Sequence, residues 1–99
     1  MTITKTLNGS ECILTVEGRL DAESAPKLRA VVETLDEVSD LTLDFSRLLY
    51  ISSAGLRVLM IAHRVVGEDG IIRVIHAKDV IRTVLEMTGF AAVLTIEDN

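Results

Sequence analysis

The chain has 99 residues, of which 48% are hydrophobic and 25% are charged, and its formal net charge is −5. This length and balance predict one globular domain, residues 1–99, with a single core. The acidic balance and the small number of aromatic residues, one Tyr and two Phe, argue against a nucleic-acid-binding surface. No uncharged run approaches the roughly 20 residues that cross a bilayer, so membrane insertion is not expected.

The N-terminal segment lacks the basic and then apolar layout of a signal peptide, which favours a cytoplasmic protein. The single cysteine, Cys12, excludes an internal disulfide and a multi-cysteine metal site. Because Cys12 falls in an alternating strand pattern, we expect it to be a small buried side chain rather than a reactive thiol.

The first elements should be an antiparallel hairpin with strands at about 2–7 and 11–17. Apolar and polar residues alternate in the first segment and in part of the second, and Asn8-Gly9 between them tolerates the positive φ of a tight turn. A helix should follow and run through about Leu35, with Asp21 as a fair N-cap. Since Pro26 is acceptable only in a first turn, the helix should begin near residues 24–25 or have an irregular first turn.

A third strand is expected over 41–45, parallel to the second because a helix lies between them. The apolar residues 48–51 then lead into two serines and a helical pattern that should run from Ser53 to about Val66 and stop at Gly67. Serine is a favoured N-cap, and a helix start also attracts phosphate, so Ser53 is a candidate cap, a candidate phosphorylation site, or both.

The C-terminal part should add a strand over 71–75, a helix from about Lys78-Asp79 that ends with Gly89 as its C-cap, and a short strand over 92–96. The predicted order is β-β-α-β-α-β-α-β. This order predicts an α/β domain with a mixed, largely parallel sheet.

Catalytic signals are missing around the serines. His63 lies ten residues beyond Ser53 on the same predicted helix, about 15 Å along its axis, and is too far away to activate the hydroxyl. His76 has no sequence link to Ser53, and the Gly-x-Ser-x-Gly pattern of hydrolases is absent. The histidines and the cysteine have no metal-ligand spacing, and no phosphate-binding glycine loop occurs, so neither an enzyme nor a cofactor is expected.

The helix that begins near Ser53 has two contrasting faces. At 100° per residue, the side chains predicted to face the sheet are Leu56, Leu59, Ala62, His63 and Val66. The opposite arc holds Ser53, Arg57, Met60, Ile61 and Arg64. Apolar side chains between arginines favour a partner-binding surface, with scattered surface residues of no function as the alternative. A phosphate on Ser53 would add about −1.5 to −2 charge at the edge of this surface and would repel a partner that had to desolvate it.

Four stretches together resemble the STAS domain family, and more narrowly the single-domain bacterial anti-sigma factor antagonists. They are Gly18-Arg19-Leu20-Asp21, Leu43-Asp44-Phe45-Ser46, residues 50–59 with the sequence YISSAGLRVL, and Met87-Thr88-Gly89-Phe90. The resemblance covers the whole chain.

The resemblance implies a partner-switching cycle. The unphosphorylated antagonist binds an anti-sigma factor that is also a serine protein kinase, the kinase phosphorylates it with ATP, and a metal-dependent serine phosphatase resets it. By position, the acceptor is Ser53, two residues before Gly55, and Asp21 matches an acidic residue beside the switch serine.

One position departs from the pattern. Many antagonists have Asp immediately before the acceptor, where this chain has Ser52, so Ser52 is an alternative acceptor. The family also includes STAS subunits of phospholipid-transport ABC systems, which are not phosphorylated, and this remains the alternative function. An acyl-transfer enzyme that uses Ser53 is a third possibility, and we expect no such activity.

Overall fold

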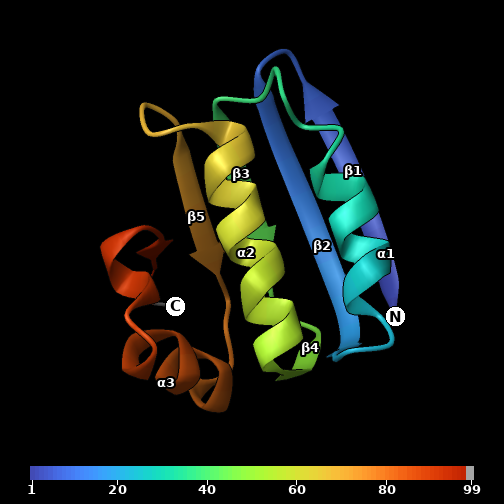
Figure 1. Ribbon diagram of the computed structural model, residues 1–99, viewed down its shortest axis with the longest axis vertical. Helices are drawn as coiled ribbons and strands as arrows, with labels where there is room; N and C mark the ends of the chain where they lie inside the picture. The colour runs from blue at the N-terminus through green and yellow to red at the C-terminus, as the bar shows by residue number, and fades with distance from the viewer. Residues whose placement is uncertain (98–99) are drawn as a thin grey trace.

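Strands and helices alternate through residues 1–97, the part of the chain that the computed structural model describes. Figure 1 shows their arrangement. The elements are β1 (Thr2–Asn8), β2 (Glu11–Leu20), α1 (Ala25–Val32), β3 (Asp40–Asp44), β4 (Leu48–Ile51), α2 (Ser53–Val66), β5 (Ile71–Ile75), α3 (Asp79–Met87), a 3₁₀ helix (Phe90–Ala92) and β6 (Thr95–Ile96).

The strands form one mixed sheet in the order β1-β2-β3-β5-β6, with β4 paired to β2 outside this path. Only the β1–β2 pairing is antiparallel within the described residues, and the other strand pairs are parallel. The predicted α/β domain and its largely parallel sheet are therefore confirmed.

Strand β2 has two parallel partners on the same side. Its first half, 11–15, pairs with β3, and its end, 18–20, pairs with β4. The register shifts at Gly18, whose φ of +108° lies in the region that favours glycine. This change of partner carries the end of β2 alongside β4, directly before α2.

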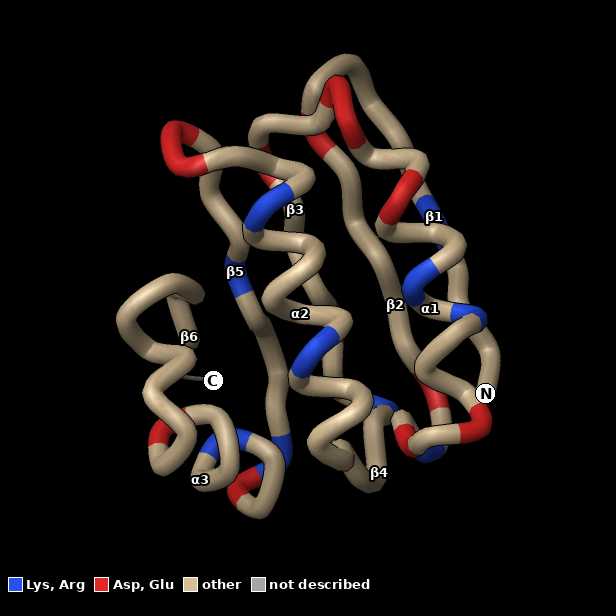
Figure 2. The backbone as a smooth tube through the Cα atoms, in the orientation of Figure 1, with Lys and Arg blue, Asp and Glu red and all other residues tan. Residues whose placement is uncertain are grey.

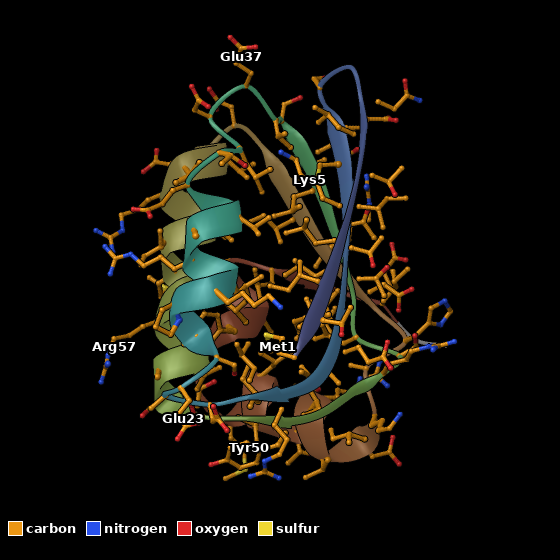
Figure 3. All side chains as sticks on the ribbon, turned by 90° about the vertical axis from the view of Figure 1, so that its right-hand side faces the viewer. Met1, Lys5, Glu23, Glu37, Tyr50 and Arg57 are labelled. Atoms are coloured by element: carbon orange, nitrogen blue, oxygen red, sulfur yellow. The ribbon has the colours of Figure 1, made fainter. Side chains whose placement is uncertain are left out.

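Helices α1 and α2 cover one face of the sheet (Figures 1 and 3). Alternate side chains of the strands fill the space beneath them, including Leu14, Leu43 and Val74, each at most 1% exposed. Cys12 belongs to this core at 1% exposure, as expected. Helix α3 lies near the lower end of the sheet in Figure 1 and contacts β4.

Several predicted boundaries were wrong. Strand β4 was not expected, because its two end residues are buried and its two middle ones are exposed, which hides the alternation of a strand. Helix α1 begins at Ala25 as predicted but ends at Val32, since the N–H of Leu35 bonds to the carbonyl of Val32 in a tighter turn. The last strand is only Thr95–Ile96, because the preceding residues form the 3₁₀ helix.

Two further details differ at helix ends. The C-cap of α3 is Thr88, and Gly89 follows it with a φ of +83°, one position beyond the predicted cap. By contrast, α2 runs from Ser53 to Val66 and is capped by Gly67, as predicted. Within residues 1–97, no helix is long and apolar enough to span a membrane.

Candidate functional site

The start of α2 and the loop after β2 meet at one edge of the sheet. Leu20 and Ile51 are paired at the ends of β2 and β4, so Asp21 and Ser52 follow neighbouring strand ends. The backbone N–H of Ser52 donates to the carbonyl of Leu20 at 2.9 Å. The sheet therefore brings together the two segments, Gly-Arg-Leu-Asp and the serine pair, that the sequence singled out.

Ser52, and not Ser53, is the N-cap of α2. Its Oγ accepts a hydrogen bond from the N–H of Gly55 at 3.3 Å, and its carbonyl accepts one from Leu56 at 2.9 Å. The prediction that Ser53 caps the helix was wrong, because either of two adjacent serines satisfies the sequence preference.

Ser53 occupies the first helical position with an exposed side chain. Its hydroxyl makes no hydrogen bond to any residue in the described part of the chain. The first turn of α2 contains no acidic residue, so the positive end of the helix dipole is not balanced by its own side chains. The site can therefore accept a negative group on Ser53.

Gly55 allows α2 to pack closely on the strand ends. A Cβ at this position would lie 2.6 Å from Cγ and 2.9 Å from Cδ2 of Leu20, and 3.0 Å from Cγ1 of Ile51. Leu20 is fully buried, so it has little space to move. The glycine thereby sets how near the serine pair lies to β2.

Asp21 organises the turn between β2 and α1. Its Oδ1 accepts hydrogen bonds from the backbone N–H groups of Glu23 and Ser24, each at 3.1 Å. These bonds, above all the one from Ser24, lower the pKa of Asp21, with a smaller contribution from the charge of Arg19. Asp21 thus carries a negative charge within the turn that follows β2.

Asp21 is not the N-cap of α1, although the sequence made it a fair candidate. The cap residue is Ser24, whose side chain does not cap the helix. Its Oγ donates to the carbonyl of Arg19 at 2.6 Å and accepts from the N–H of Asp21 at 3.0 Å. Asp21 and Ser24 therefore stabilise the turn before α1 and not its first helical turn.

The outer face of α2 carries the predicted partner-binding residues. Arg57, Met60 and Arg64 are exposed and Ile61 is half-buried. Arg57 points away from the sheet in Figure 3. The opposite face is as predicted for Leu59, Ala62 and Val66, which are buried, whereas Leu56 and His63 are half-buried and Val58 is buried instead.

An open groove of about 670 Å³ lies between this face and α1. Its lining consists of Arg29, Arg57, Met60, Ile61, Arg64 and Val65. Arg29 comes from α1, and the sequence did not indicate it, because nothing in the pattern tells which side of α1 turns toward α2.

His63 does not approach the serines in this arrangement. Because α2 is an unbroken helix from Ser53 to Val66, His63 stays about 15 Å along the axis from Ser53. Burial raises the pKa of the Cys12 thiol, so it remains protonated. Over residues 1–97, no group of His, Cys, Asp and Glu side chains could hold a metal ion.

The family model described as "Mlab, STAS domain" matches residues 3–95. A search of curated proteins finds no match. Among solved structures, an anti-sigma factor antagonist from Mycobacterium paratuberculosis is 19% identical with a TM-score of 0.87, and the match covers 99% of this chain and 86% of that one. A candidate anti-sigma factor antagonist from Thermotoga maritima is 18% identical with a TM-score of 0.85, over 98% and 86% of the two chains.

The anti-sigma factor antagonist SpoIIAA is also similar. Its unphosphorylated form is 17% identical with a TM-score of 0.78, over 99% of this chain and 89% of that one. The phosphorylated form of SpoIIAA from Bacillus has a TM-score of 0.76 at 16% identity, over 99% and 93% of the two chains. At these identities the structures share the fold of this chain. Since the family model spans nearly the whole sequence, the chain belongs to the STAS domain family, and its fold resembles that of the anti-sigma factor antagonists.

Proposed function

We propose that the chain is an anti-sigma factor antagonist that works by partner switching in the cytoplasm. Unphosphorylated, it binds an anti-sigma factor that is also a serine protein kinase, and the sigma factor is released to direct transcription. The kinase transfers the γ-phosphoryl group of ATP to Ser53, and the phosphoprotein dissociates. A metal-dependent serine phosphatase removes the phosphate. The chain catalyses no step itself and uses no cofactor.

The exposed hydroxyl of Ser53 carries this proposal. It stands at the first position of α2, next to the turn that Asp21 organises, while Ser52 performs the capping. A kinase active site can reach Ser53 without breaking a hydrogen bond of the fold.

The same position explains how phosphate acts as a switch. The free N–H groups at the start of α2 and Arg57, one turn further on, stabilise the phosphate within the free protein. A partner seated on Arg57, Met60, Ile61 and Arg64 has to desolvate a group of about −1.5 to −2 charge at the edge of its interface. Each 1.4 kcal/mol of that cost weakens binding about tenfold.

Ser52 is the less suitable acceptor. It is half-buried, its N–H donates to Leu20, and its Oγ holds the N–H of Gly55. Phosphorylation there requires the first turn of α2 to open.

The test is phosphorylation by the cognate kinase with ATP, followed by mass spectrometry. We expect one phosphate on the wild type, none on Ser53→Ala, and one on Ser52→Ala. Ser53→Asp should bind the kinase at least about tenfold more weakly than the wild type. Phosphate that persists in Ser53→Ala and disappears in Ser52→Ala would move the switch to Ser52.

A second candidate function is the STAS subunit of a phospholipid-transport ABC system. The residue at position 52 favours this second function. Many antagonists have Asp at this position, directly before the acceptor serine, whereas this chain has the uncharged Ser52. This function predicts a stable complex with a transporter ATPase and no phosphorylation of Ser53. Gene neighbourhood, either a kinase with a sigma factor or a permease with an ATPase, separates the two.

A further inference from the structure

The groove between α1 and α2 combines an apolar floor with a basic rim. Ile61 and Val65 are half-buried at its floor and Met60 is exposed beside them. Arg29 from α1 and Arg57 and Arg64 from α2 complete the lining. A smaller hollow of about 250 Å³ shares Arg29, Arg57 and Ile61 and extends toward the first turns of both helices.

This basic rim is unusual for so acidic a chain. The sequence has 15 Asp and Glu residues, and none of them lies in Ala25–Val32 or Ser53–Val66. Figure 2 shows basic segments along both helices and acidic segments beyond their ends. Charge is therefore segregated, with the α1–α2 layer basic on a molecule of net charge −5.

The arginines of the rim are open to a partner. Arg29 contacts Glu33 at 3.6 Å, but both side chains are more than half exposed, so this ion pair is weak and screened. Arg57 and Arg64 form no ion pair with any side chain among residues 1–97. Carboxylates of a partner protein can therefore pair with these three arginines without first breaking a strong ion pair.

We propose that the groove docks an acidic amphipathic helix, whose apolar side chains lie on Met60, Ile61 and Val65 and whose carboxylates pair with Arg29, Arg57 and Arg64. This inference rests on the proposed function, in which the helix belongs to the anti-sigma factor. A second copy of the chain is a poor occupant, because two such faces related by a two-fold axis bring arginines against arginines. A lipid surface is also a poor occupant, because Met60 is the one exposed apolar side chain of this lining, whereas Ile61 and Val65 are half-buried.

Arg57 connects the groove to the switch. It lines both hollows and lies one turn after Ser53. A phosphate on Ser53 attracts Arg57, which then competes less well for a carboxylate of the docked helix. The same phosphate also repels the carboxylates of that helix, so both effects weaken docking.

A fluorescently labelled synthetic peptide with leucines on one helical face and glutamates along both flanks tests the groove, with binding measured by anisotropy. Arg29→Gln and Arg64→Gln should each weaken binding roughly three- to tenfold. Arg47→Gln is the charge-matched control, since Arg47 lies in the β3–β4 connection, and it should leave binding unchanged. Met60→Asp should abolish binding, while Met87→Asp on the exposed face of α3 should not.

Three results with the peptide would overturn the inference: equal loss with Arg47→Gln, equal binding of a peptide with lysines in place of glutamates, or no binding at all. Tighter binding to anionic vesicles than to the peptide, lost in the same variants, would assign the face to a membrane. Failure of the proposed function is distinguishable: if the peptide binds the groove but the kinase leaves Ser53 unmodified, the inference holds alone. If Ser53 is phosphorylated and Met60→Asp and Arg64→Gln weaken kinase binding but Arg29→Gln does not, only the inference fails.

Discussion

Two adjacent serines at the start of α2 have different structural roles. Oγ of Ser52 accepts a hydrogen bond from the N–H of Gly55, and the N–H of Ser52 donates to the carbonyl of Leu20. The side chain of Ser53, by contrast, is exposed to solvent. Capping a helix and accepting a phosphate both need a free oxygen, so one serine cannot serve both needs at once without weakening the first turn. The pair separates the two needs, which leaves Ser53 open to modification at little cost to the fold.

Because the two serines have different roles, substitutions at the two positions should change the free energy of unfolding differently. Ser52→Ala should lower the free energy of unfolding by about 1 kcal/mol, because a helix cap is lost. Ser53→Ala should change it by less than about 0.5 kcal/mol, as for other exposed positions. Ser53→Asp should raise it by about 0.3–1 kcal/mol through the helix dipole. Urea unfolding followed by circular dichroism measures all three, and a larger loss for Ser53→Ala than for Ser52→Ala would reverse the assignment of the cap.

Asp21 should make the stability of the domain depend on pH. Hydrogen bonds from Ser24 and Glu23 lower its pKa in the folded state, so its contribution is complete above the unfolded pKa of about 3.9. That contribution is lost as the pH falls through the folded pKa. Asp21→Asn keeps an acceptor oxygen but does not titrate, so its urea midpoint should decline less than that of the wild type between pH 5 and about pH 3. Parallel declines in the two proteins would show that other carboxylates dominate.

At the scale of elements, the strand β4 and the helix α2 form one unit with the end of β2. The three residues 18–20 of β2 pair with β4, and Gly55 places the first turn of α2 against Leu20. The position of Ser53 therefore depends on a buried contact between non-adjacent segments, and not on the serine itself.

Gly55→Ala should test this contact. Alanine favours a helix by up to about 1 kcal/mol over glycine, but its Cβ would lie 2.6 Å from Cγ of the buried Leu20. Overpacking of a core typically costs about 1–3 kcal/mol, so we expect a net loss of roughly 1–2 kcal/mol. The double variant with Leu20→Ala should lose less than the sum of the two single changes. Additive losses would show that Leu20 does not oppose the new methyl group.

Local signals in the sequence predicted those elements that depend on local chemistry. The hairpin of β1 and β2 and the periodic helix over Ser53–Val66 are determined by backbone preference and by a long apolar stripe, and both elements were predicted. The hairpin turn lies one residue later than expected, because Asn8 pairs with Glu11 and only Gly9 of the expected turn has a positive φ. Strand β4 was missed because only its pairing with β2 makes it a strand. Arg29 was missed for the same reason, since its place in the groove depends on how two helices pack.

At the scale of the whole molecule, the sheet divides the domain into a basic helical layer and a more acidic remainder (Figure 2). The long strand β2 runs through the molecule and pairs with three other strands. Its buried face belongs to the single core, so separation of β2 from its neighbours requires loss of that core. Such a domain should unfold in one cooperative step.

Cys12 provides a direct test of this cooperativity. It lies in β2 between Leu7 of β1 and Leu41 of β3, at 1% exposure, and burial raises the pKa of its thiol. A stability of at least about 5 kcal/mol should slow its reaction with a disulfide reagent more than about a thousandfold relative to the unfolded chain.

The opening free energy from the labelling of Cys12 should equal the free energy of unfolding measured in urea, and it should fall with urea at the same slope. A chain with Cys12→Ala and Thr4→Cys is the control, because position 4 lies on the exposed side of β1 and its thiol should react at once. Labelling of Cys12 that is fast and nearly independent of urea would mean that β1 detaches by itself. In that case the domain would unfold in stages from the edge of the sheet, and the α1–α2 layer with Ser53 could remain folded after β1 has gone.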